Sequence, residues 1–153
     1  MERLDRIDAL LPVETASATA TRELGARLAG QMGAGDILAL YGDLGAGKTE
    51  LVKGLCGKFG IDEHDVNSPT FKIVNEYRSG SIPIFHFDAY RIKGLDEFYD
   101  LGYEDYFFDE GLAVVEWAEK VESLLPEDAV RIRLEHLPGD RRRISLLRKE
   151  EVT

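Results

Sequence analysis

A glycine-rich segment at residues 42–49 carries the clearest chemistry in this sequence. It reads Gly-Asp-Leu-Gly-Ala-Gly-Lys-Thr, the P-loop pattern of a glycine, four residues and then Gly-Lys-Thr. Glycines at these positions let consecutive backbone N–H groups turn inward on a phosphate with no side chain in the way. The pattern predicts that Lys48 reaches the β- and γ-phosphates of a nucleotide and that the Thr49 hydroxyl binds Mg²⁺.

The residues on both sides of this segment match the context that a P-loop requires. Residues 37–41 are an apolar run short enough for a buried strand. Residues 50–59 place their apolar side chains on one helical face, and Gly60 follows as a C-cap. The positive end of this helix dipole would face the phosphates. The sequence therefore predicts a strand, a phosphate-binding loop and a helix in this order.

Two other predicted strands end in carboxylates. One ends in Asp88 and the other in Glu116. An acid at the carboxyl end of an apolar strand beside a P-loop takes the place of a Walker B aspartate, and ligands bind in the crevice at such strand ends. One carboxylate could complete the Mg²⁺ shell with Thr49 while the other orients an attacking water, and the pattern does not assign the two roles. Lys48, Asp88 and Glu116 are thus the candidate catalytic residues.

The rest of the chain predicts alternating helices and strands. A long helix is expected from Ser17 or Thr19 to about Met32, and a short helix from Ala118 to Leu125. The predicted strands share either an apolar run or an apolar–polar alternation, and they lie at 10–15, 37–41, 71–78, 82–88, 112–115, 129–137 and around 144–146.

Two short turns decide the type of sheet. The turn at 79–81 and the turn at 138–140 each join two strands into an antiparallel hairpin, so the sheet should combine parallel and antiparallel strands. The second hairpin should have one wet face, which includes Arg131, and residues 141–143, three consecutive arginines, should form a solvated turn. We therefore predict an α/β fold: a single P-loop NTPase domain over residues 1–153, with a mixed parallel/antiparallel sheet flanked by helices.

Charge is distributed unevenly along the chain. The 153 residues carry a formal net charge of −10, and residues 86–128 hold 13 acidic and 3 basic side chains. This acidic segment disfavours direct binding of nucleic acid, because neutralising phosphates needs clustered Lys and Arg. It is either a solvated face or a docking surface for a basic partner.

The cysteine and histidine content bears on the compartment and on metals. A single cysteine, Cys56, excludes an internal disulfide and favours a reducing compartment, and its place on the apolar helix face predicts core packing. His64, His86 and His136 have no metal-ligand spacing with it, so a zinc site is not expected. Residues 1–11 lack the long apolar core of a signal peptide, and no segment has the length of a transmembrane helix. We expect a cytoplasmic protein with no membrane association.

Several motifs occur together in an order that resembles the bacterial TsaE (YjeE) family. Besides the P-loop, they are Ser-Pro-Thr-Phe at 68–71, His-Phe-Asp-Ala-Tyr-Arg at 86–91, Asp-Tyr-Phe at 105–107 and Glu-Trp at 116–117. The resemblance implies the ATPase component of the machinery that makes threonylcarbamoyladenosine on tRNA, with ATP/ADP and Mg²⁺ as its ligands. It also implies binding to a TsaD–TsaB complex, with tRNA reached only through that complex.

The resemblance further implies roles for individual residues. Glu116 would hold Mg²⁺ with Thr49, and Asp88 is a candidate for placing water or for an outer contact. Residues 68–70 resemble a switch loop that responds to the γ-phosphate, and Trp117 would lie near the nucleotide. The triphosphate would be held by Leu44, Gly45, Ala46, Gly47, Lys48 and Thr49.

Two other functional classes remain open at this stage. P-loop folds also transfer phosphate to hydroxyls, so a small-metabolite kinase is one alternative, although the chain has no long lid insertion. The other is a nucleotide-loaded regulatory binding module with little turnover. Because no internal arginine finger is evident, a low basal ATPase rate that rises with a partner is expected.

Overall fold

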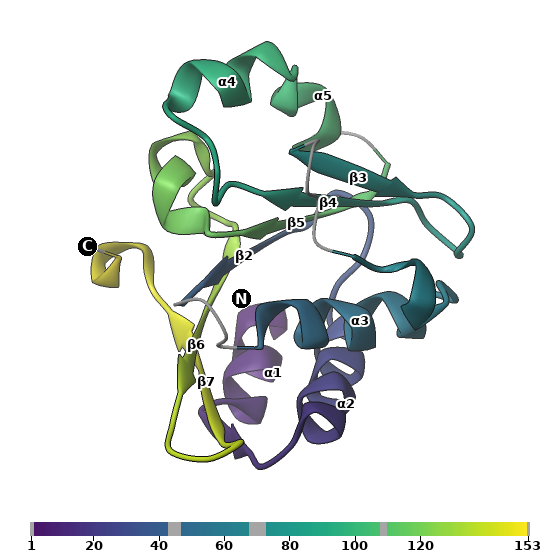
Figure 1. Ribbon diagram of the computed structural model, residues 1–153, viewed down its shortest axis with the longest axis vertical. Coiled ribbons are helices and arrows are strands. Elements are labelled where there is room, and N and C mark those ends of the chain that lie inside the picture. The colour runs from purple at the N-terminus through teal and green to yellow at the C-terminus, as the bar shows by residue number, and fades with distance from the viewer. Residues whose placement is uncertain (1, 43–46, 68–72, 108–109, 153) are drawn as a thin grey trace.

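A mixed β-sheet runs through the molecule (Figure 1). The computed structural model describes residues 2–42, 47–67, 73–107 and 110–152, which form seven strands in the order β1-β7-β6-β2-β5-β4-β3. The four central strands, β6, β2, β5 and β4, run parallel, whereas β7, β1 and β3 are antiparallel to their neighbours. The predicted mixed sheet is therefore confirmed. The strands are β1 (Val13–Thr15), β2 (Ile37–Tyr41), β3 (Val74–Tyr77), β4 (Ile84–Asp88), β5 (Leu112–Glu116), β6 (Val130–His136) and β7 (Arg142–Leu147).

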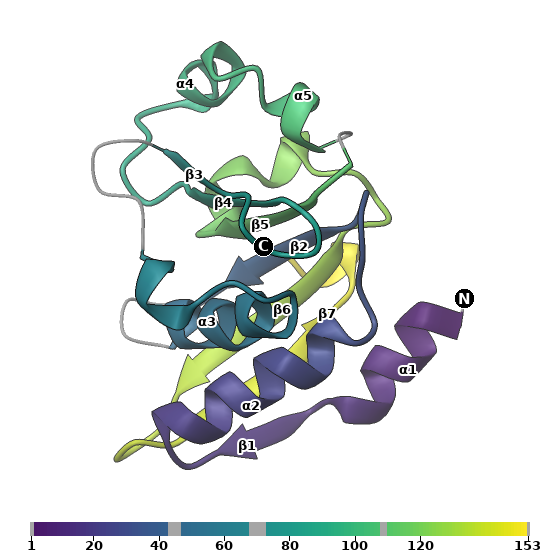
Figure 2. The ribbon, with the colours of Figure 1, turned by 90° about the vertical axis from the view of Figure 1, so that its right-hand side faces the viewer.

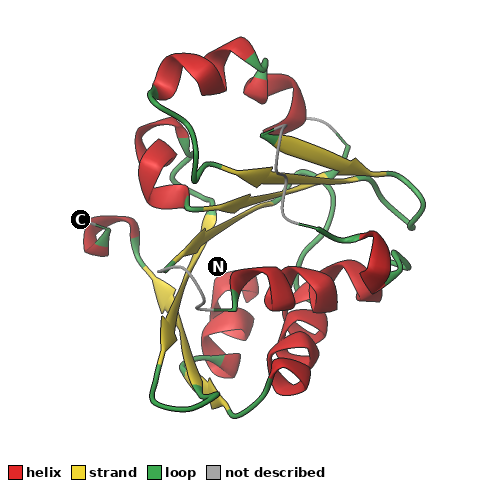
Figure 3. Ribbon diagram, viewed as in Figure 1, coloured by secondary structure: helices red, strands yellow, loops and turns green. Residues whose placement is uncertain are grey.

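Helices cover both faces of the sheet. Figure 2 shows α1, α2 and α3 together on one side and α4 and α5 on the other, and Figure 3 separates these helices from the strands and loops. The 3₁₀-helix η2 packs on the same side as α4 and α5. The helices are α1 (Glu2–Leu10), α2 (Ala18–Ala29), α3 (Lys48–Lys58), α4 (Leu95–Asp100) and α5 (Tyr103–Phe107), with 3₁₀-helices η1 (Glu63–Asp65), η2 (Ala118–Leu124) and η3 (Lys149–Glu151).

Each face of the sheet has its own hydrophobic core. In β2, Leu38 and Leu40 belong to the core shared with α1, α2 and α3, while Ile37, Ala39 and Tyr41 belong to the core shared with α4, α5 and η2. This division follows from the strand geometry, because successive side chains point to opposite faces. Every residue of β2 is buried, which explains the uninterrupted apolar run that predicted it.

The amino-terminal region differs from the prediction. The structure has the helix α1 over Glu2–Leu10, where no element was predicted, and the strand predicted at 10–15 is confined to Val13–Thr15. Ile7 is fully buried in the core and Leu11 is nearly so. The helix has few apolar residues, so its stability comes from this tertiary burial rather than from a strong periodic pattern.

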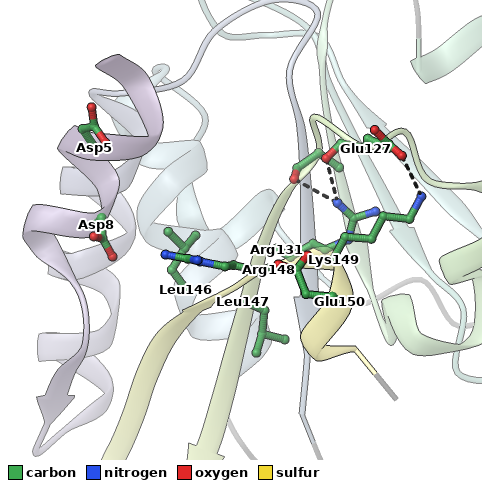
Figure 4. A pocket seen from close by; sticks show the side chains of 10 residues that line it. Asp5, Asp8, Glu127, Arg131, Leu146, Leu147, Arg148, Lys149 and Glu150 are labelled. Carbon is green, nitrogen blue, oxygen red and sulfur yellow. Dashed lines mark hydrogen bonds and ion pairs between the residues drawn. The ribbon is translucent and has the colours of Figure 1, made fainter. Parts of the chain in front are cut away.

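The predicted carboxy-terminal hairpin of β6 and β7 is present. The prediction that its solvent-exposed face includes Arg131 is wrong. Arg131 is 2% exposed, because η2 and the turn before β6 cover it. Its guanidinium pairs with the Glu122 carboxylate at 2.9 Å and donates to the backbone carbonyls of Pro126, Glu127 and Ala129. Figure 4 shows Arg131 and Lys149 on either side of Glu127 at the wall of a cavity. Arg131 is therefore a buried structural residue.

Two glycines bring α2 and α3 into backbone contact. A Cβ added at Gly25 would overlap the carbonyl oxygen of Leu51, and one added at Gly54 would overlap that of Arg22. The two helices can therefore approach this closely only because both positions lack a side chain. Since α3 begins at Lys48, this contact sets where the amino-terminal end of α3 lies relative to the sheet.

Candidate nucleotide-binding site

Three parallel strands end at the same level of the sheet. Leu40 of β2 is paired with Glu116 of β5, which is in turn paired with Asp88 of β4. In Figure 1 the arrowheads of β2, β5 and β4 point toward the same side, where the chain passes from β2 to α3. The strand and helix predicted around the P-loop are confirmed, and so are the two strands that end in carboxylates.

The P-loop itself is described only at its two ends. Leu44, Gly45 and Ala46 lie outside the described residues, so their predicted contacts with a triphosphate stay predictions. Gly47, the N-cap of α3, has a φ of +94° in the left-handed region that favours glycine. Its backbone therefore turns the chain into α3, whose amino-terminal end is suited to an anion.

One of the three consecutive arginines lies beside this turn. Residues 141–143 were expected in a solvated turn, but Arg142 begins β7 and is only partly exposed. A Cβ placed on Gly47 would be 3.4 Å from Arg142 Nε, so the arginine side chain borders the end of the P-loop. No local sequence signal could have predicted this contact between segments so far apart in the chain.

Lys48 is buried at the start of α3, with 5% of its surface exposed. Its ammonium group donates to the carbonyl of Gly42, at the other end of the P-loop, and lies 3.6 Å from the centre of the Trp117 ring. A cation over an aromatic face is attracted by the negative charge of that face. The structure therefore places Trp117 next to the P-loop lysine. Its closeness to the nucleotide, which the family resemblance implies, stays a prediction.

The backbone at Trp117 is unusual. Among the described residues it is the only non-glycine residue with a positive φ, at 58°. This conformation costs about 1–2 kcal/mol for a residue with a Cβ, and such strain is concentrated at functional sites. Here it turns the chain directly after Glu116, and the indole ring then lies 4.8 Å from the Tyr90 ring.

Thr49 and Glu116, the two predicted metal ligands, are brought together. Thr49 Oγ1 lies 3.4 and 3.5 Å from the two carboxylate oxygens of Glu116, which is 3% exposed. Mg²⁺ prefers oxygen ligands, and it commonly takes one or two protein groups together with substrate phosphates and water. The pair fits that requirement. No cluster of three or more His, Cys, Asp or Glu side chains suited to a metal occurs in the described part of the chain.

Asp88 is half-buried at the end of β4, next to Glu116 in the sheet register. One of its oxygens accepts the backbone N–H of Tyr90 at 2.9 Å. Burial raises the pKa of the Asp88 carboxyl, and the charge of Glu116 raises it further, while the Tyr90 N–H, His86 and Lys48 act in the opposite direction. A carboxylate with a raised pKa is a better proton acceptor than one in water.

His86 is a site residue that the sequence prediction did not include. It is fully buried, and its Nε2 lies 2.5 Å from Glu116 Oε2. A signal was present in the strand alternation, because His86 is two residues before Asp88 and must therefore point to the same face of the sheet. That face also carries Glu116, which made the contact predictable in principle.

The part of the acidic segment in α4 and α5 has exposed carboxylates. Asp96 and Asp100 of α4 and Glu104 and Asp105 of α5 are exposed, and Tyr99 beside them is 53% exposed.

No helix in the described parts of the chain combines the length and the apolar character needed to cross a membrane. Residues 68–70, the expected switch loop, lie outside the described residues.

Comparisons with known proteins show which family this chain resembles. A family model described as "Threonylcarbamoyl adenosine biosynthesis protein TsaE" matches residues 15–144. The chain is 45% identical over 111 residues to the tRNA threonylcarbamoyladenosine biosynthesis protein TsaE of Bacillus subtilis (strain 168), covering 72% of this chain and 68% of the relative. It is 47% identical over 109 residues to the protein of the same description from Synechocystis sp., covering 69% and 68%. A solved structure, "Crystal structure of Bacillus subtilus YdiB", superposes with a TM-score of 0.71 at 34% identity, covering 89% of this chain and 83% of that one.

Proposed function

This chain belongs to the TsaE family, and on that premise we propose that it binds ATP with Mg²⁺ and hydrolyses it in support of threonylcarbamoyladenosine biosynthesis on tRNA. The observation that carries the proposal is the position of Thr49 within 3.5 Å of the Glu116 carboxylate, with Lys48 adjacent at the start of α3. These residues come from the first turn of α3 and the end of β5, which are far apart in the sequence, and nucleotide hydrolysis requires them side by side.

Each residue has a specific task in the proposed reaction. The backbone amides at the start of α3 and the Lys48 ammonium neutralise the charge that develops on the γ-phosphate. Thr49 and Glu116 would hold Mg²⁺, which would supply further charge neutralisation. Asp88 is the candidate for orienting the attacking water and accepting its proton, because its raised pKa favours proton uptake.

The test compares Lys48→Ala with Lys53→Ala, a control on the same helix. Lys53 pairs with Glu50 at 3.6 Å and is partly exposed. Lys48→Ala should lower phosphate release from ATP by about 10²-fold or more, because it removes a charge aimed at the transition state. Lys53→Ala should retain the wild-type rate. Phosphate release would be measured with a coupled assay, and nucleotide affinity with a fluorescent ATP analogue.

Three outcomes would contradict hydrolysis by this site. Wild-type turnover in a folded Lys48→Ala variant would remove the P-loop from the mechanism. Phosphate appearing on an added small-molecule hydroxyl instead of in solution would indicate a kinase. Tight ATP binding with no phosphate release, with or without partner proteins, would indicate a regulatory binding module.

The same proposal includes docking to a TsaD–TsaB complex through the exposed acids of α4 and α5. Exposed charge pairs contribute about 0.2–1 kcal/mol each and are screened by salt. A double change, Asp96→Asn with Asp100→Asn, should therefore weaken binding to the complex by about 2- to 30-fold at low salt, and by less at moderate salt. Glu23→Gln, an exposed acid of α2, is the control.

Free tRNA should bind this chain poorly, because its phosphates meet the same acidic surface. Affinities for the protein complex and for tRNA would be measured at low and moderate salt. Tight, salt-sensitive tRNA binding by the chain alone, with no affinity for the protein complex, would contradict this part of the proposal.

A further inference from the structure

A chain of hydrogen bonds, buried at His86 and partly buried at its other end, runs from the backbone of Asn67 to the carboxylate of Glu116. The hydroxyl of Tyr77 lies 3.3 Å from the Asn67 N–H nitrogen and 2.9 Å from His86 Nδ1. His86 Nε2 lies 2.5 Å from Glu116 Oε2. Tyr77, His86 and Glu116 are 8%, 0% and 3% exposed, so water does not substitute for these contacts. The chain spans three neighbouring strands of the sheet, β3, β4 and β5.

Both ring nitrogens of His86 take part in this chain. A carboxylate can only accept, so His86 Nε2 carries the proton that faces Glu116. The other ring nitrogen, Nδ1, contacts the Tyr77 hydroxyl, which accepts the Asn67 N–H and also lies 3.0 Å from the Asn67 carbonyl oxygen. The side-chain amide of Asn75 donates to the same carbonyl at 2.9 Å. His86 therefore joins the Glu116 carboxylate to Tyr77, and Tyr77 joins the imidazole ring to the backbone of Asn67.

The contact with His86 holds one oxygen of Glu116 while both carboxylate oxygens face Thr49. Oε2 accepts from His86 and lies 3.5 Å from Thr49 Oγ1, and Oε1 lies 3.4 Å from the same hydroxyl. A buried carboxylate without such a partner would be free to rotate and would lose a hydrogen bond. We propose that His86 and Tyr77 are positioning residues that orient the Glu116 carboxylate toward Thr49 and anchor it to the backbone of Asn67. This role rests on the proposed function, in which Glu116 and Thr49 hold Mg²⁺.

A residue that hydrogen-bonds to a metal ligand without touching the metal typically contributes 10–100-fold to metal affinity or activity, as seen when it is removed. The direct readout is the gain in affinity for a fluorescent ADP analogue when EDTA is replaced by Mg²⁺. His86→Leu should reduce this gain by about 10–100-fold, with the affinity in EDTA unchanged. His86→Gln should restore part of the gain, because its amide can still donate to Glu116.

A second variant guards against misfolding of the histidine variants. Tyr77→Phe removes only the hydroxyl, and it should reduce the Mg²⁺ gain in the same direction but by less than His86→Leu. Tyr103→Phe is the matched control, because Tyr103 has the same 8% exposure but packs on Phe98 and Phe107 in the other core. It should leave the gain at the wild-type value.

A spectroscopic readout tests the arrangement without any nucleotide. The ¹⁵N shifts of the His86 ring in the free protein should show Nε2 protonated, and Tyr77→Phe should change the Nδ1 shift. A ring protonated at Nδ1 alone, or a Mg²⁺ gain that is unchanged in folded His86→Leu and Tyr77→Phe, would overturn the positioning role. A wild-type chain that binds the nucleotide equally well in Mg²⁺ and in EDTA would instead refute the proposed function, and the inference with it.

Discussion

Replacing Arg131 with methionine should strongly destabilise the fold. The change removes the cationic partner of Glu122, whose side chain is 21% exposed and keeps the Tyr41 hydroxyl, and it removes three hydrogen bonds to backbone carbonyls of the turn before β6. Loss of one partner from a buried pair costs about 3–5 kcal/mol. Glu122 can recover some hydration, so we expect the lower end, about 3 kcal/mol. For a chain of this size that corresponds to a melting temperature about 6–12 °C lower.

The assay is urea denaturation followed by circular dichroism, with the slope of the transition checked against the wild type. Arg133→Met makes the same chemical change on the same strand at a partly exposed position, and it should alter stability by no more than about 0.5 kcal/mol. Adding Glu122→Leu to Arg131→Met should recover part of the loss, because no buried charge then lacks a partner. A loss below about 1 kcal/mol for Arg131→Met alone, with an unchanged slope, would refute the structural role.

Three further predictions concern the site and the core. Burial raises the pKa of Asp88 above its ordinary 3.8, so its favourable contribution to stability is complete below pH 3.8 and is lost as the pH rises through the folded-state pKa. Asp88→Asn should therefore stabilise the chain at pH 7 but not at pH 3.5, as measured by urea denaturation. Gly47→Ala should lower stability by about 1–2 kcal/mol and weaken nucleotide binding, because a Cβ is strained at φ +94° and meets Arg142, whereas Gly57→Ala, with open space around it, should be neutral or stabilising. Cys56 is fully buried and its pKa is raised to about 12, so a thiol reagent at pH 8 should label it in urea but not in the native protein.

The parts of the fold that local pattern predicted are those where a short segment contains all the information. The β2 run, the P-loop and α3 are continuous in sequence, and the glycine spacing fixes their order. Asp88 and Glu116 were predicted at the site because each ends an apolar strand, and parallel strands end together. Of the two predicted helix caps, Ser17 and Thr19, the structure uses Ser17, whose hydroxyl accepts the Ala20 N–H at 3.0 Å.

The parts that local pattern missed depend on contacts between distant segments. The alternation in β6 marks Arg131 as a polar-face residue, and only the position of η2 over that face shows that it is buried. Likewise, the link between His86 and Glu116 joins residues that are 30 positions apart, and it follows only once β4 and β5 are known to be neighbours. The helix α1 was missed because its stability depends on the core that the rest of the chain builds around Ile7.

The backbone contact between α2 and α3 affects how an activity screen of this protein should be interpreted. An alanine at Gly25 or Gly54 would push α3 away from α2 and shift Lys48 and Thr49 with it. A displacement of about 1 Å at reacting groups can reduce a rate by about 10²-fold. Both glycines would thus resemble catalytic residues in a survey scored by turnover alone, although neither has a side chain that could take part in chemistry. A parallel survey scored by folded protein abundance would assign both glycines to helix packing. Substitutions at Lys48 and Thr49 would lower turnover in the first survey and leave abundance unchanged in the second.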